Sequence, residues 1–316
     1  MAPQARRPPG VPTIEAIKGL YGSAQANLYD YYEIATRCHE YVLNNSTEEM
    51  ISLGYSLRSG GINLDVRPIK HNLFIWDVEE FKNRTSIFEF INNPSSIELN
   101  EVNRHKYRSI LYTIQKSIES FLDLKVDAQQ ARKVVGEVFQ GFVSEIFKTK
   151  QCLTLGGGVS FTIPAIQTED TEEDQEDHKV KLSFDLLVRK FGSIRNADFQ
   201  ETDIICGVKT TTKDRGNMFF VDRYLYHQTQ TTRPKFIAVC LNDVQRKKNR
   251  LRQTVGVSFT FLPGHFKLYE HVFGQLDGYY FIDPPPRFEE TALMRENLNT
   301  MDKLMLDHLP IWHSNA

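Results

Sequence analysis

The residues whose types could carry chemistry stand in two expected strands. Asp185 interrupts the apolar run KLSFDLLV, and Lys209 follows the run DIICGV. A charged group inside an apolar strand costs free energy unless it is paired or binds a metal ion. Two interpretations follow from these two residues alone. One is a salt bridge between Asp185 and Lys209, and the other is a metal-dependent site.

Asp222 favours the second interpretation. Apolar side chains repeat on one face of the helix expected over 218–230, and Asp222 falls within that face. Carboxylate oxygens are the ligands that Mg²⁺ prefers. Asp185 and Asp222 therefore suit a divalent metal, with Lys209 polarising a water molecule or balancing the charge of a phosphate. Such a set fits the metal-dependent hydrolysis of a phosphodiester.

Three charged residues of alternating sign follow at the mouth of the second strand. They are Lys213, Asp214 and Arg215. Lysine and arginine can bind O6 and N7 of guanine, and aspartate can accept a hydrogen bond from N4 of cytosine. The tripeptide therefore suits the reading of a C·G pair. The alternative is an ion pair within a loop, which contributes little to stability.

The charge of the chain is unevenly distributed. The net charge is only −2, yet residues 169–177 hold seven acidic residues. Residues 207–252 hold eleven Lys or Arg against three Asp. A basic segment in a nearly neutral protein indicates a polyanionic partner bound at one place. Scattered charge on a solvated surface is the alternative, and charge alone does not separate the two.

Composition narrows the class of protein. Apolar residues make up 41% of the 316 residues and charged residues 25%, which are values of a globular protein. No apolar run is long enough to cross a membrane, and the N-terminus does not resemble a secretory signal. The four cysteines form no CxxC pair, so neither a zinc site nor a disulfide framework is expected. Free thiols predict a cytoplasmic protein.

The order of expected elements predicts a mixed α/β fold. Residues 1–130 are expected to be helical and to scaffold the protein or grip a partner. Residues 131–316 are expected to form a catalytic core, with a central sheet flanked by helices. The helices are expected over 14–44, 78–92, 104–124, 131–148, 218–230, 264–275 and 288–307, and the strands over 159–166, 180–188, 203–212, 236–241, 255–262 and 278–283. The glycines at 156–158 predict a turn.

Together these residues resemble a known family. Asp185, the strand ending in Lys209, the run KTTTKDR and the acid thirteen residues after the lysine are similar to PD-(D/E)XK nucleases. They most resemble type II restriction endonucleases of the branch that cuts CCGG and CCNGG sites. The resemblance covers about residues 131–240. It implies a restriction-endonuclease-like core, catalytic Asp185 and Lys209, a displaced metal-binding acid at Asp222, and base reading by residues 213–215.

The sequence departs from the family pattern in three places. Phe184 replaces the usual proline, and Gly207 stands where aspartate or glutamate is commonest. Asp203 lies roughly 20 Å back along the strand and cannot replace that acid. Gly207 therefore indicates either the displaced acid at Asp222 or an inactivated nuclease. Gln140 occupies the place of a catalytic glutamate on the helix over 131–148, and neither Glu137 nor Glu145 is assigned in its stead.

These patterns predict a type II site-specific endonuclease. It would cleave double-stranded DNA by Mg²⁺-dependent hydrolysis at a short, GC-rich palindromic site. A homodimer is expected because a palindrome mirrors two-fold protein symmetry. One alternative is a sequence-specific DNA-binding protein without cleavage. Another is a repair or recombination nuclease with the same fold.

Overall fold

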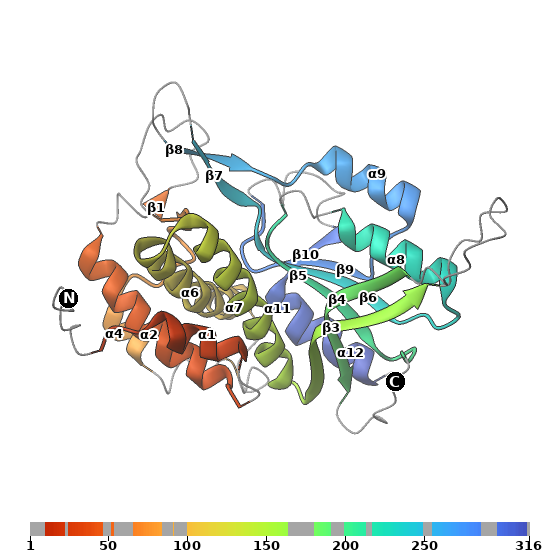
Figure 1. The fold of residues 1–316 in the computed structure, drawn as a ribbon, viewed down its shortest axis with the longest axis horizontal. Helices are drawn as coiled ribbons and strands as arrows, with labels where there is room; N and C mark the ends of the chain where they lie inside the picture. Colours follow the sequence, from red (N-terminus) through yellow and green to blue (C-terminus); the bar gives the residue numbers. More distant parts are fainter. Residues whose placement is uncertain are drawn as a thin grey trace, which may run out of the picture.

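The computed structural model describes residues 10–22, 25–46, 52–53, 66–83, 91, 100–163, 180–190, 199–212, 217–248, 255–285 and 296–314. A six-stranded mixed sheet lies at the centre, with helices on both faces (Figure 1). This is the α/β architecture that the sequence predicts. The order of strands across the sheet is β10 (Leu298–Thr300), β9 (Gly278–Phe281), β6 (Lys235–Asn242), β5 (Ile204–Thr211), β4 (Val180–Lys190) and β3 (Cys152–Ile163).

The sheet changes direction at β5. Strands β3, β4 and β5 pair antiparallel, whereas β5, β6, β9 and β10 run parallel. Successive residues of β5 enter opposite cores: Ile204, Cys206 and Val208 join one cluster, and Ile205 joins the other. This period of two places Gly207 and Lys209 on the face of Ile205. Strands buried on both faces explain the near-continuous apolar runs in the sequence.

Each face of the sheet has its own helical layer. Helix α7 (Ala128–Lys148) contacts β3, β4 and β5 on one face, and its side-chain cap is Asp127. Helices α8 (Met218–Thr229) and α9 (Pro263–Phe273) contact each other, and their aromatic side chains join the cluster of Ile205 on the opposite face. Among the described residues, none of the helices is long and apolar enough to span a membrane.

The N-terminal region packs against α7. It comprises α1 (Ile14–Gly22), α2 (Leu28–Asn45), β1 (Ser52–Leu53), β2 (Ile69–Lys70), α4 (Val78–Lys82) and α6 (Glu101–Lys125). Helix α6 is buried continuously from Ser109 to Leu122, polar residues included. One apolar cluster extends from Ile17 to Leu309, so this region and the α7 face of the sheet share a core across residue 130.

The structure differs from the expected elements in several places, beginning with the helix expected over 14–44, which is the two helices α1 and α2. Part of the helix expected over 288–307 is strand β10, followed by α11 (Met301–Lys303), a π-helix (Leu304–His308) and α12 (Leu309–Ser314). The three residues of β10 pair with β9, a non-local contact that periodicity does not reveal. The glycines at 156–158 lie within β3 rather than in a turn. Residues 244–248 form strand β7, paired with β8 (Val255–Phe259).

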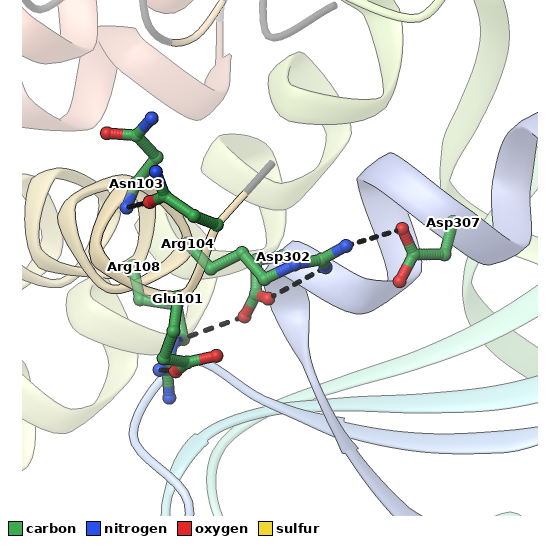
Figure 2. A network of polar contacts seen from close by, with 7 residues as sticks. Glu101, Asn103, Arg104, Arg108, Asp302 and Asp307 are labelled. Atoms are coloured by element: carbon green, nitrogen blue, oxygen red, sulfur yellow. Dashed lines mark hydrogen bonds and ion pairs between the residues drawn. The ribbon is translucent and has the colours of Figure 1, made fainter. Parts of the chain in front are cut away.

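Ion pairs connect helix α6 of the N-terminal region to the C-terminal helical segment that begins at α11 (Figure 2). Arg104 and Arg108 of α6 both reach the buried carboxylate of Asp302, at 3.3 Å and 3.2 Å. Arg104 also contacts Asp307 at 2.8 Å, and Arg108 contacts Glu101 at 3.2 Å. The side chain of Asp302 is only 4% exposed, so its carboxylate is buried between these two guanidinium groups.

This network yields a stability prediction. Asp302→Asn leaves two guanidinium groups facing each other without their shared carboxylate, so we expect the free energy of unfolding to fall by about 3 kcal/mol. Asp307→Asn is the matched control. The side chain of Asp307 is 32% exposed, and its loss should cost less than about 1 kcal/mol. Urea unfolding of both variants measures the difference, and equal costs would contradict the prediction.

Candidate active site

Asp185, Lys209 and Asp222 line one cavity of about 520 Å³. Asp185 comes from β4, Lys209 from the C-terminal end of β5, and Asp222 from the first half of α8. Phe219 and the glycine at 207 line the same cavity. The fold thus brings together the three residues that the sequence singles out as catalytic.

The carboxylate of Asp185 lies where two strands separate. Backbone pairing between β4 and β5 ends at Leu186 and Cys206. Beyond that pair, the Asp185 carboxylate accepts a hydrogen bond from the backbone N–H of Val208 at 2.8 Å. The same oxygen accepts a second from Nζ of Lys209 at 2.6 Å. The salt bridge considered from the sequence is therefore present, and it lies in the cavity rather than in the core.

Asp222 adds a second carboxylate to this pair. Burial and the nearby negative charge of Asp185 raise the pKa of Asp222 to about 6, while Lys209 opposes the shift. Two carboxylates facing one ammonium group leave an excess of negative charge in a partly buried cavity. A simple salt bridge does not account for that excess, whereas a divalent cation would neutralise it.

The residues present fit a divalent metal held by two protein carboxylates. Asp185 and Asp222 supply hard oxygen donors of the kind that Mg²⁺ accepts. Within the described part of the chain, no group of three or more His, Cys, Asp or Glu residues is arranged to hold a metal ion. Mg²⁺ usually retains several water ligands, so two carboxylates with water and substrate phosphate suffice for it.

Phe219 explains the glycine at position 207. A Cβ atom added to Gly207 would overlap the aromatic ring of Phe219. The ring therefore fills the space beside the strand where a side chain two residues before Lys209 would stand. Helix α8 approaches the sheet closely at this point and brings Asp222, three residues after Phe219, to the cavity. Gly207 and Asp222 thus reach one cavity through the packing of Phe219 on the strand.

Gln140 contacts the site from the opposite face of the sheet. Its side-chain amide on α7 donates a hydrogen bond to the backbone carbonyl of Asp185. The two glutamates of the same helix have other partners. Glu145 pairs with Lys148, and Glu137 is hydrogen-bonded to Tyr21, whose pKa is raised by burial and by that carboxylate. Of the three residues left unassigned by the sequence, Gln140 is the one that touches Asp185.

Asp203 has a structural partner. It is fully buried and forms two hydrogen bonds with the guanidinium group of Arg189, at 2.7 Å and 2.6 Å. This bidentate pair satisfies both carboxylate oxygens of Asp203. Asp203 is not among the residues that line the cavity, in agreement with its expected distance from Lys209.

Two further expectations concern the apolar face of α8 and the tripeptide at 213–215. The apolar stripe of α8 is less complete than expected, because Met218 is largely exposed while Phe219, Phe220 and Tyr226 are buried. Lys213, Asp214 and Arg215 lie outside the described residues, so their predicted role in base reading stays a prediction. Thr212 and Asn217, on either side of them, line a second cavity with His265 and aromatic side chains.

Comparison with known proteins identifies the fold. Neither a family model nor a curated protein sequence matches the chain. The structure is similar to that of the type IIP restriction endonuclease Kpn2I, with a TM-score of 0.67 over 96% of this chain and 97% of that one, at 16% identity. It is also matched to restriction endonuclease PspGI in a complex with substrate DNA, at a TM-score of 0.39, 11% identity, and 73% and 93% coverage. The chain has the fold of type II restriction endonucleases.

The contact between Gly207 and Phe219 yields a prediction. Gly207→Ala should lower the free energy of unfolding by about 1–3 kcal/mol, because the new methyl group overlaps the ring. Phe219→Leu should recover part of that loss in the double variant, giving a non-additive cycle. Gly136→Ala is the matched control. An added Cβ at Gly136 meets no atom, and alanine should stabilise helix α7 by about 0.5–1 kcal/mol. The prediction would be contradicted if the effects of Gly207→Ala and Phe219→Leu on the free energy of unfolding were additive.

Proposed function

We propose that the protein is a type II site-specific deoxyribonuclease. It cleaves double-stranded DNA by Mg²⁺-dependent phosphodiester hydrolysis at a short, GC-rich palindromic site, and it acts as a homodimer in the cytoplasm. The observation that carries the proposal is the grouping of Asp185, Lys209 and Asp222 in one cavity on this fold. In this proposal residues 131–316 are the catalytic core, and residues 1–130 scaffold it or grip DNA.

Each of the three residues has a separate role. Asp185 and Asp222 would hold the Mg²⁺ ion, which would act as a Lewis acid on the reacting phosphate. Lys209 places an ammonium group 2.6 Å from the Asp185 carboxylate, where it orients the attacking water and balances charge that develops on the phosphate oxygens. The hydrogen bond from the Val208 N–H fixes the carboxylate of Asp185 before substrate arrives.

Two other functions are compatible with the same fold. A DNA-binding protein without cleavage would follow if Gly207 marked a lost catalytic acid. The packing of Phe219 on Gly207 supports the displaced acid instead, because the same helix carries Asp222 to the cavity that Gly207 lines. A repair nuclease of the same fold would recognise DNA structure rather than sequence.

Digestion of plasmid DNA separates these functions. The full chain with Mg²⁺ should give discrete fragments, and mapping their ends gives the recognition site and the cut position. Smears or cuts confined to branched DNA would indicate a repair nuclease. Binding without cutting would indicate the DNA-binding protein, and chelation of the metal should stop all cleavage by the proposed enzyme.

Asp222→Asn tests the displaced acid. Asparagine keeps the size of the side chain and removes its charge, so the fold should persist while calorimetric titration shows weaker Mg²⁺ binding. We expect the cleavage rate to fall by at least about 100-fold, because a charge that stabilises the transition state is lost. Asp185→Ala should also abolish cleavage. Asp307→Asn removes a carboxylate outside the cavity and should cut at the wild-type rate. Full activity of Asp222→Asn at low Mg²⁺ would overturn its assigned role.

Arg215→Ala tests base reading once the site has been mapped. We expect the specific complex to weaken by about 1–3 kcal/mol, the usual size of a bidentate contact to a base. Binding to unrelated DNA should weaken less. Arg215→Lys retains the charge without the planar fork and should recover little specificity. An equal loss on every sequence would make Arg215 a phosphate contact rather than a base reader.

A further inference from the structure

A basic hairpin stands outside the six-stranded sheet. Strands β7 (Val244–Lys248) and β8 (Val255–Phe259) form their own two-stranded sheet in five consecutive antiparallel pairs. Strand β7 contains Arg246, Lys247 and Lys248, and the sequence adds Arg250 and Arg252 before β8 begins. No acidic residue occurs in the printed sequence from Val244 to Tyr269. A basic segment without acidic residues suits a partner that supplies negative charge.

The hairpin rises from the edge of the sheet that holds the candidate active site. Strand β6 pairs with β5 through Lys209 and Cys240, and then through Thr211 and Asn242, just before β7 begins. Figure 1 shows the hairpin at the top of the view, where it extends beyond the central sheet. The strand that leads into the hairpin is therefore the immediate neighbour of the strand that carries Lys209.

Hydrogen bonds at the base of the hairpin fix its position. The backbone N–H of Thr260 donates to the carbonyl of Asp243 at 2.7 Å, and the Thr260 hydroxyl donates to the same carbonyl at 2.8 Å. The Thr260 hydroxyl also lies 2.7 Å from that of Thr212 at the end of β5. These contacts join the hairpin to the residue that precedes the predicted base-reading tripeptide.

Both acids described at the base of the hairpin are buried. Asp243 directly precedes β7, yet it is only 1% exposed, as is Asp283 beside it. Lys70 of the N-terminal region pairs with Asp283 at 2.7 Å. These two carboxyl groups are thus held inside the protein beside a lysine of the N-terminal region, and the hairpin itself contains no acidic residue.

We propose that the β7–β8 hairpin is an arm that binds the sugar–phosphate backbone of duplex DNA beside the cleaved site. The proposal rests on the proposed function for the identity of its partner. By register, Arg246 and Lys248 share one face of the ribbon and Lys247 lies on the other. Strand β7 is about 14 Å long, which matches roughly four base-pair steps of B-DNA. Lysine binds phosphate as a point charge, so these contacts add affinity without reading sequence.

The test measures DNA binding by the full chain in EDTA, so that no cleavage occurs. The variant carries Arg246→Gln, Lys247→Gln and Lys248→Gln, and anisotropy of a labelled random-sequence duplex is recorded over a range of salt concentrations. Each lost phosphate contact reduces the magnitude of the slope of log K against log salt by about 0.9, so loss of the two cations that share a face should reduce it by about 2. Affinity should fall to a similar extent on every duplex sequence.

Two controls make the result specific. Lys18→Gln, Lys133→Gln and Lys303→Gln together remove the same charge from exposed positions on other elements, and their slope should fall by less than one. Arg246→Lys, Lys247→Arg and Lys248→Arg retain the cations and should retain the wild-type slope. The thermal midpoint of each variant confirms that the protein is folded.

The outcomes separate the arm from the nuclease. A wild-type slope in the glutamine variant, or a loss equal to that of the control lysines, would overturn the arm even if the protein cuts DNA at discrete sites. A loss confined to one duplex sequence would also overturn it, because the hairpin would then read bases. A reduced slope in a protein that never cuts would support the arm while the proposed cleavage fails. Failure of the wild-type protein to bind any duplex would overturn both.

Discussion

Strands β4 and β5 separate after the pair formed by Leu186 and Cys206, and the carboxylate of Asp185 occupies the gap. The backbone N–H of Val208 would otherwise lack an acceptor from β4, and an unpaired buried N–H is costly. Asp185 supplies that acceptor and so becomes part of the sheet as well as part of the cavity. Its second hydrogen-bond partner is Lys209, the residue that follows Val208 in β5. The separation of two strands therefore creates the site and fixes its first two residues together.

Both helical layers depend on this point in the sheet. From one face, Gln140 of α7 donates to the backbone carbonyl of Asp185. From the other, Phe219 of α8 packs on Gly207, and one turn later Asp222 reaches the cavity. A side chain at position 207 would overlap the ring of Phe219, so the ring would have to move. Gly207 and Asp222 are consequently linked through Phe219, whose ring packs on the strand and whose helix carries the acid.

The sequence is most informative where a charged residue interrupts an apolar pattern. Asp185, Lys209 and Asp222 were predictable because strands and helices have fixed periods, and burial of a charge demands a reason. The sequence draws attention to Gln140 but does not predict its partner, because the hydrogen bond joins residues 45 positions apart. The overlap of Gly207 with Phe219 depends on the distance between a strand and a helix, which no period encodes. Strand β10 was mistaken for helix because three residues paired with β9 carry no pattern of their own.

Two acidic residues follow the C-terminal ends of neighbouring parallel strands at the edge of the sheet near the cavity. Strands β6 and β9 end near Asp243 and Asp283, and both carboxylates are buried. Burial and the charge of Asp283 raise the pKa of Asp243 to about 7, and Lys70 from the N-terminal region opposes that shift. These acids are held inward with a lysine of their own, while the basic residues of β7 follow immediately in the chain. The chain segment that follows at this edge is basic in sequence, and the cavity beside it carries two carboxylates. A polyanion that contacts such an edge gains affinity from its flanks, and a divalent cation between Asp185 and Asp222 would remove the repulsion that the cavity alone presents to phosphate.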